Sequence, residues 1–79
     1  MSEQRFRQEV TGWQVMRPGP ASGTWVPLSP TALPGETIEV NYAASDAHVC
    51  LLGYGGRVVH SSPMFGGAVT GQRVRMEWA

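Results

Sequence analysis

Four side chains in the second half of the chain are of the types that bind copper, namely His48, Cys50, His60 and Met64. Three residues separate His60 from Met64, which is a short enough spacing for both to reach one metal ion. The hairpin register that the sequence predicts, however, directs His60 to the opposite side of the sheet from His48 and Cys50. We therefore expect no metal site and no cofactor, and we expect Cys50 to pack as a small apolar side chain.

Cys50 and His48 are also the residue types of a thiol nucleophile and its general base, and both lie on one face of a predicted strand. Such a pair needs a third group that orients the base, yet the only Asp of the chain, Asp46, lies at the start of the same strand. Ser61 and Ser62 are not in the sequence context of a nucleophile. The sequence therefore predicts that the protein is not an enzyme.

Aromatic side chains offer a third kind of chemistry, because their flat faces stack on sugar rings. The strand pattern places Trp13 and Trp78 at inward positions, where they would fill a small core. Trp25 lies beside a proline in an irregular segment, so we expect it to be partly exposed. Trp25 and Tyr54 could together form a carbohydrate-binding platform, and this is the alternative function that the sequence offers.

The segment from Pro63 to Gly67 places two large apolar side chains, Met64 and Phe65, in a glycine-flanked loop. Loops are normally polar, so this loop is the clearest anomaly of the sequence. It either contacts a partner or folds back to cap one end of the core. We favour the partner, because two bulky side chains exceed what one cap needs.

The predicted first and last strands share one charge pattern. If they were antiparallel neighbours, two arginines would face each other and could hold a carboxylate or phosphate, whereas the simpler interpretation is a solvated sheet face. The pattern consists of Arg5, Arg7, Glu9 and Arg73, Arg75, Glu77.

The chain has 79 residues, and its six cations, all arginine, balance six acidic residues. A net charge of zero argues against nucleic-acid binding, which needs uncompensated positive charge. A single cysteine excludes an internal disulfide. No apolar run is long enough to span a membrane, and the segment after Met1 does not resemble a signal peptide. We therefore expect synthesis in the cytoplasm, with incorporation into a particle as one destination.

Alternation with a period of two predicts short antiparallel strands throughout, separated by glycines and prolines. The segment 17–35 is rich in Pro and Gly and is expected to be irregular, apart from a short edge strand. The first strand changes parity at Gly12, which predicts a bulge or a kink there. The expected strands are 5–16, 24–28 (the edge strand), 36–43, 47–54 (a central strand), 57–61 and 72–78. In the half-buried strand 36–43, Ile38, Val40 and Tyr42 share the face that we expect to point inward.

Gly55 and Gly56 predict a two-residue hairpin turn, which sets the register of the two strands that flank it. Leu52 then pairs with Val59, and Tyr54 with Arg57. One face of the hairpin carries Val49, Leu51, Val58 and His60, and we expect it to form the core. The other face mixes apolar and polar groups as a contact surface would, and it carries His48, Cys50, Leu52, Tyr54, Arg57, Val59 and Ser61.

These patterns predict a single all-β domain over residues 1–79, built as a small antiparallel β-sandwich or a partly open barrel of five to seven short strands. The segment Leu33-Pro34-Gly35-Glu36-Thr37-Ile38-Glu39-Val40 resembles the turn-and-strand signature of many immunoglobulin-like modules. The resemblance covers about a tenth of the chain and implies an immunoglobulin-like fold only in a loose sense.

The function expected from these features is a non-catalytic structural or assembly module that contacts protein, either a partner or further copies of itself. A small decoration or tail component of a virus particle would be such a non-catalytic assembly module. The residues expected to contact the partner are Trp25, His48, Leu52, Tyr54, Arg57, Val59, Met64 and Phe65.

Overall fold

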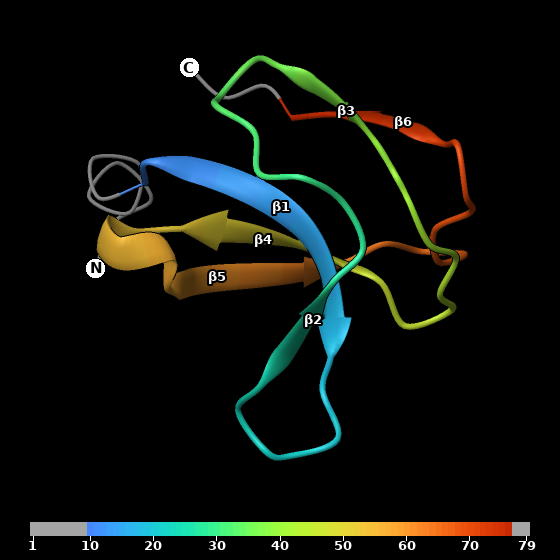
Figure 1. Ribbon diagram of the computed structural model, residues 1–79, viewed down its shortest axis with the longest axis horizontal. Helices are drawn as coiled ribbons and strands as arrows, with labels where there is room; N and C mark the ends of the chain where they lie inside the picture. Colours follow the sequence, from blue (N-terminus) through green and yellow to red (C-terminus); the bar gives the residue numbers. More distant parts are fainter. Residues whose placement is uncertain (1–9, 77–79) are drawn as a thin grey trace.

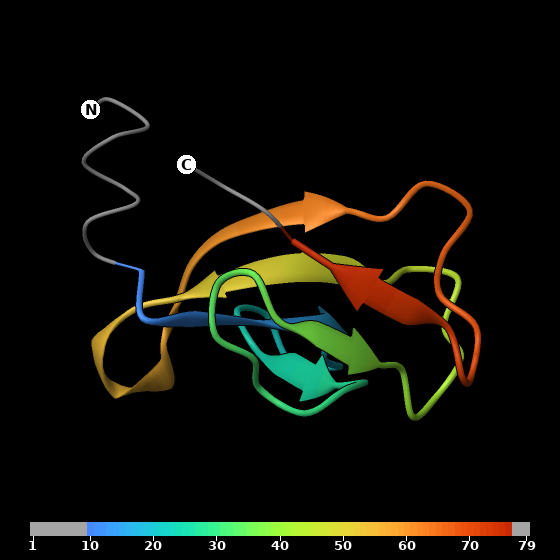
Figure 2. The same cartoon turned by 90° about the horizontal axis from the view of Figure 1, so that it is seen from above.

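The computed structural model describes residues 10–76, which form two antiparallel sheets stacked as layers (Figures 1 and 2). The larger sheet has the strand order β2-β1-β4-β5, and the smaller sheet pairs β3 with β6. The all-β prediction is confirmed, and the sheets do not close into a barrel. The strands are β1 (Gly12–Pro18), β2 (Trp25–Pro27), β3 (Thr37–Glu39), β4 (His48–Leu52), β5 (Val58–Pro63) and β6 (Arg73–Arg75), and η1 (Tyr54–Gly56) is a short 3₁₀ turn.

The main core lies between the two layers and contains Trp13 and Val15 of β1, both fully buried. The small sheet contributes Ile38 and Val40 from β3 and its continuation. Half-buried apolar side chains from β4 and β6 pack against this core at its margin. The inward parity predicted for Trp13, Ile38 and Val40 is therefore confirmed, while Trp78 lies outside the described residues.

The strand predicted over residues 36–43 is shorter in the structure, and Tyr42 does not point inward as expected. The predicted turn before it is present, since the Glu36 N–H donates to the Leu33 carbonyl oxygen (3.1 Å). The Val40 N–H still bonds to Gln72 of the small sheet, but the Asn41 N–H donates to Leu28 (2.7 Å) instead. The chain therefore leaves the small sheet after Val40, and Tyr42 is two-thirds exposed.

The predicted first strand, residues 5–16, is described only from residue 10. β1 begins at Gly12, where the parity change was expected, and it continues past Met16 to Pro18. β6 pairs with β3 over its described length, in the register Glu39 opposite Arg73. The pairing considered between the first and last strands involves Arg5, Arg7, Glu9 and Glu77, which lie outside the described residues.

The hairpin of β4 and β5 has the predicted register along most of its length, with Cys50 opposite Ser61. Near the turn the register shifts by one residue, so Leu52 pairs with Val58 and not with Val59. The prediction of a two-residue turn is wrong, because η1 inserts a 3₁₀ turn in which the Gly56 N–H donates to Gly53 (3.0 Å).

This shift changes which side chains share a face. Val58 now lies on the same side of the sheet as Cys50 and not on the core side with Val49. The predicted pairing of Tyr54 with Arg57 is also wrong, because the Gly53 N–H donates to the Arg57 carbonyl oxygen (2.8 Å).

Gly67 offers a test of the loop packing that closes one end of the sandwich. Both Gly66 and Gly67 have positive φ angles, 85° and 74°, so a side chain at either position costs about 1–2 kcal/mol. A Cβ atom at Gly67 would also lie 2.6 Å from the Ala44 carbonyl oxygen, whereas nothing surrounds one at Gly66.

We predict that Gly67→Ala lowers the free energy of unfolding by roughly 2–4 kcal/mol, while Gly66→Ala costs only about 1–2 kcal/mol. Urea unfolding of both variants measures the difference. Equal losses would show that the backbone of residues 44–45 moves aside at no cost.

Candidate functional site

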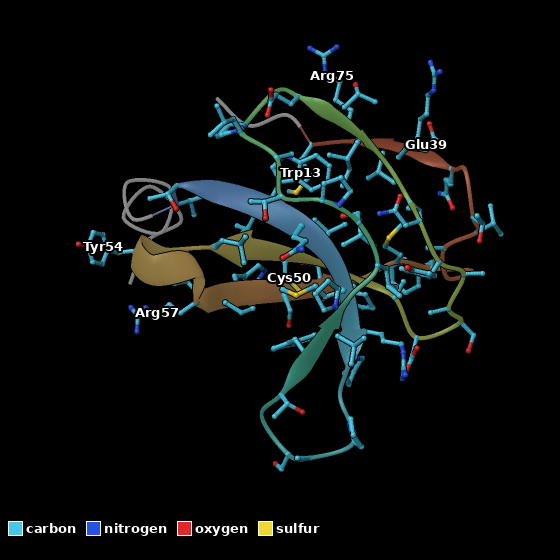
Figure 3. All side chains as sticks on the ribbon, viewed as in Figure 1. Trp13, Glu39, Cys50, Tyr54, Arg57 and Arg75 are labelled. Atoms are coloured by element: carbon cyan, nitrogen blue, oxygen red, sulfur yellow. The ribbon has the colours of Figure 1, made fainter. Side chains whose placement is uncertain are left out.

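The face of the four-stranded sheet that points away from β3 and β6, here called the outer face, carries the candidate site. Directly paired residues of antiparallel strands point to the same side of a sheet, so the register identifies its members. Figure 3 shows Trp13 directed toward β3 and β6, and Cys50 on the other side of the sheet. The outer-face positions are Gln14, Met16, Pro18, Trp25, Pro27, His48, Cys50, Leu52, Val58, Ser61 and Pro63.

None of the outer-face positions holds Asp, Glu, Lys or Arg. The outer face of an antiparallel sheet is ordinarily polar and solvated, because the other face is the one that forms the core. Here a second apolar cluster fills it, in which Met16, Cys50 and Leu52 are buried. Trp25 and Val58 pack on this cluster and are only half-buried.

This burial changes the role of Leu52, which we expected to contact a partner. Leu52 is 4% exposed and belongs to the second cluster, so it is a packing residue. Val59 is half-buried at the register shift and belongs to neither cluster. The residues of the outer face that remain accessible are Gln14, Trp25, His48, Val58, Ser61 and the prolines at its margin.

Trp25 and His48 contact each other on the outer face, with ring centroids 5.4 Å apart and an edge-to-face angle of 72°. The Nδ1 atom of His48 lies 2.9 Å from the backbone oxygen of Asp46. A carbonyl oxygen can only accept, so this bond places the proton on Nδ1. The contact joins β2 to β4 and fixes the orientation of both rings.

Cys50 lies beneath this pair and is fully buried. Burial raises the pKa of the Cys50 thiol from 9.0 to about 11, because the thiolate would lose its hydration. The thiol is therefore protonated at neutral pH, and the thiol is a poor nucleophile in that form.

The proposed copper ligands do not converge. His60 pairs with Leu51 and so points to the core side of the sheet, opposite to His48 and Cys50. Within residues 10–76, no group of three His, Cys, Asp or Glu side chains is close enough to hold a metal ion. The same part of the chain contains no helix that is long and apolar enough to cross a membrane.

Tyr54 and Arg57 lie at the hairpin tip, as Figure 3 shows, and β2, the strand that begins at Trp25, lies away from this tip in Figure 1. Tyr54 is 92% exposed in η1, beyond the last residue of β4. Trp25 contacts His48 at the first residue of β4, about 13 Å away from the last residue at 3.3 Å per residue. The two aromatic rings therefore do not form one stacking platform for a sugar.

The two apolar side chains of the loop after β5 differ in their surroundings, since one packs on the core and the other is exposed. Met64 is half-buried and packs against the main core, and its N–H donates to the Ala47 carbonyl oxygen (2.9 Å). Phe65 is 97% exposed. Met64 therefore caps the core, and of these two side chains Phe65 is the exposed one.

Sequence reasoning missed three further exposed apolar side chains, Leu33, Tyr42 and Val69. Leu33 lies in the turn before β3. Tyr42 and Val69 lie on loops that the paired backbone bonds between Ala44 and Ala68 hold together (2.9 and 3.0 Å). Val69 follows Phe65 in the same loop region, whereas Tyr42 is distant from it in sequence. Alternation assigned Tyr42 to the core, and nothing in the sequence signals that Val69 is exposed.

The raised pKa of Cys50 predicts a pH dependence of stability. The pKa of the thiol is higher in the folded state than in the unfolded state. The stabilisation that the buried neutral thiol contributes is therefore present below pH 9 and is lost as the pH rises to 11. Relative to a Cys50→Ala variant, the free energy of unfolding of the wild type should fall by about 1.4 kcal/mol per pH unit in this interval. Urea unfolding between pH 8 and 11 measures it, and parallel curves for both proteins would contradict the burial of the thiol.

Because Met64 packs on the core and Phe65 is exposed, serine substitutions at the two positions should have different effects on stability. Met64→Ser should lower the melting temperature by roughly 4–8 °C, because half-burial of a large apolar side chain is worth about 1 kcal/mol. Phe65→Ser should leave it unchanged within about 2 °C, since the ring makes no buried contact. A similar loss in both variants, measured by thermal circular dichroism, would show that Phe65 also caps the core.

No protein-family model, curated protein or solved structure matches this chain. The features of the chain that bear on its function are therefore the residues of the outer face and the two ends of the sandwich.

Proposed function

We propose that this protein is a non-catalytic module that makes protein–protein contacts within a larger assembly. The observation that supports this most is the outer face, whose positions carry no formal charge and whose apolar cluster leaves Trp25 and Val58 half-exposed. The centres of protein interfaces are depleted in charged residues in the same way, and tryptophan is enriched among the residues that dominate binding.

The exposed side chains at the two ends of the sandwich fit the same proposal. Tyr54 and Arg57 project from the hairpin tip, and Phe65 projects from the loop after β5 at the other end. Tyrosine and arginine are also residue types that anchor interfaces. A protein that joins neighbours in an assembly needs more than one contact surface, and these ends supply further ones.

The chemistry of the site favours binding over catalysis. The thiol of Cys50 is buried and protonated at neutral pH, so it is a poor nucleophile. We therefore assign no catalytic role to Cys50 and His48. Since Trp25 and Tyr54 lie at different ends of β4, we do not carry the carbohydrate alternative further.

An accessory component of a virus particle, such as a decoration or tail protein, is the setting that we propose. A small chain with zero net charge and no lysine has little electrostatic repulsion to keep it apart from neighbouring protein. A domain of this size also has a marginal core, so contacts with neighbours would stabilise it.

The test compares two matched variants on neighbouring residues of β5. Ser61 lies on the outer face opposite Cys50, and Ser62 lies on the other side opposite Val49. Affinity purification of the tagged chain from the cells that produce it should recover a stoichiometric protein partner, which can be a second copy. Ser61→Arg should lose this partner and Ser62→Arg should retain it. A wild-type chain that is recovered alone would contradict the proposed function.

A further inference from the structure

We infer that the chain consists of two copies of one three-stranded unit, residues 12–40 and 44–76, which recognise each other across an internal two-fold axis. Each unit is then the binding partner of the other, and their pairing does not depend on the peptide link between them. This inference concerns the surface between the two units and is independent of the proposed function.

The order of the strands is the first indication of the repeat. Each unit is a hairpin of two strands in the larger sheet followed by one strand in the smaller sheet, which is β1-β2-β3 in the first unit and β4-β5-β6 in the second. In the larger sheet β1 lies beside β4, with β2 and β5 at the edges, and in the smaller sheet β3 lies beside β6. Equivalent strands are therefore antiparallel neighbours in both sheets, which is the arrangement that a two-fold axis perpendicular to the sheets produces.

Both units close their hairpin with the same backbone bond. In the first unit the N–H of Leu28 donates to the Val15 carbonyl oxygen (2.8 Å), and in the second the N–H of Met64 donates to the Ala47 carbonyl oxygen (2.9 Å). Each donor follows the proline that ends an edge strand. The hairpin of the second unit is longer, because η1 lies at its tip.

The segment that crosses from the larger sheet to the smaller one is also held in the same way twice. Ala32 exchanges two backbone bonds with Trp13 (both 2.8 Å), and Ala68 exchanges two with Ala44 (2.9 and 3.0 Å). Both Ala32 and Ala68 are buried in the main core. The same number of residues separates Leu28 from Ala32 as separates Met64 from Ala68, so the equivalence holds residue by residue.

The turn before the last strand of each unit repeats a side-chain bond as well. The N–H of Leu33 donates to the Glu36 carboxylate (2.6 Å), and the Glu36 N–H donates back to the Leu33 carbonyl oxygen (3.1 Å). Val69 and Gln72 exchange the same two bonds (both 3.0 Å), with the side-chain amide oxygen of Gln72 in place of the carboxylate. Two turns that share an acceptor side chain at the same position are evidence for one repeated sequence motif.

The glycines of these turns connect each unit to the other. Gly35 and Gly71 have φ angles of 83° and 85°, as the third position of a type II turn requires. The N–H of Gly35 donates to the Met76 carbonyl oxygen of the second unit (3.1 Å), and the N–H of Gly71 donates to the Val40 carbonyl oxygen of the first (2.8 Å). The bonds between the units are therefore reciprocal, as in a two-fold interface between identical subunits.

The residue pairs at the centre of each sheet locate the axis. Met16 and His48, which each follow the acceptor of the bond that closes the hairpin, pair with each other in the larger sheet. Ile38 and Val74, at the same distance after the two turn glycines, pair with each other in the smaller sheet. A pair of equivalent residues that face each other lies on the two-fold axis, so one axis passes through both sheets at these two points.

The surface between the units is apolar and contains the main core. Trp13 and Ile38 of the first unit are buried there with Ala68 of the second. The link contributes no buried side chain, since Tyr42 and Ala43 are exposed. A repeated unit that cannot bury its apolar face alone is stabilised by its neighbour in the repeat. Six apolar side chains at the margin of this core all come from the second unit, namely Ala44, Val49, Leu51, Met64, Val74 and Met76.

The test cuts the folded chain at the link between the units. A protease recognition sequence is inserted between Tyr42 and Ala43, and a control carries the same sequence between Gly55 and Gly56 in η1. Cleavage of the first variant yields two whole units, whereas cleavage of the control divides the second unit. Sedimentation velocity of the first variant should show one species with the mass of the uncut chain after cleavage.

The fragments are then unfolded in urea, separated and mixed in equal amounts without denaturant. The two whole units should recover the circular dichroism of the uncut chain. The control fragments should need about tenfold higher concentration or more, because a divided unit must order both of its pieces during assembly.

Three results would overturn the inference, namely units that separate on cleavage, units that stay unfolded after mixing, and control fragments that recover at the same concentration as the whole units. If the first variant does not fold before it is cut, residues 1–42 and 43–79 are produced together in one cell with a tag on one of them. The two pieces should then purify together, and recovery of the tagged piece alone would also contradict the inference.

Discussion

The fold depends on the burial of Trp13 between the two layers. Its side chain is fully buried, and its indole N–H donates to the Leu33 carbonyl oxygen (3.0 Å). Its backbone also exchanges two hydrogen bonds with Ala32 (both 2.8 Å). One residue therefore fills the core and fixes the segment that crosses from the larger sheet to the smaller one. A domain with so little interior has few other large side chains that could take this place.

This anchoring has a consequence for the outer face. Because β1 directs Trp13 and Val15 to the main core, the alternation of the strand directs Met16 to the other side. There it meets Cys50 and Leu52, so the central strands are apolar on both faces. Sheets with two apolar faces normally have a layer on each side. In residues 10–76 the second layer covers one face only, while on the other face Trp25 and Val58 pack over the buried side chains and stay half-exposed themselves. We propose that partner contacts cover this remaining exposed part.

The two ends of the sandwich differ in how they are built. The hairpin tip is a local structure, in which η1 holds Tyr54 and Arg57 in solvent. The opposite end is built from loops distant in the chain, and the bridge between Ala44 and Ala68 brings them together. At the tip, Tyr54 is exposed beside its neighbouring glycines. At the opposite end, Met64 packs against the main core and Phe65 is exposed.

The alternation of side chains determined the fold class, the central position of β4, the edge position of β2 and the inward direction of Trp13, because these depend on the period of a strand and on glycine and proline. The tertiary structure alone decided that Leu52 is buried and that Tyr42 is exposed. Tyr42 is exposed because the strand ends after Val40, where Asn41 bonds to the distant Leu28. Leu52 is buried because it packs with Cys50 and with Met16 of β1. The tertiary structure also decided which apolar face is covered, because a sequence pattern shows that a side chain is apolar but not what lies opposite it.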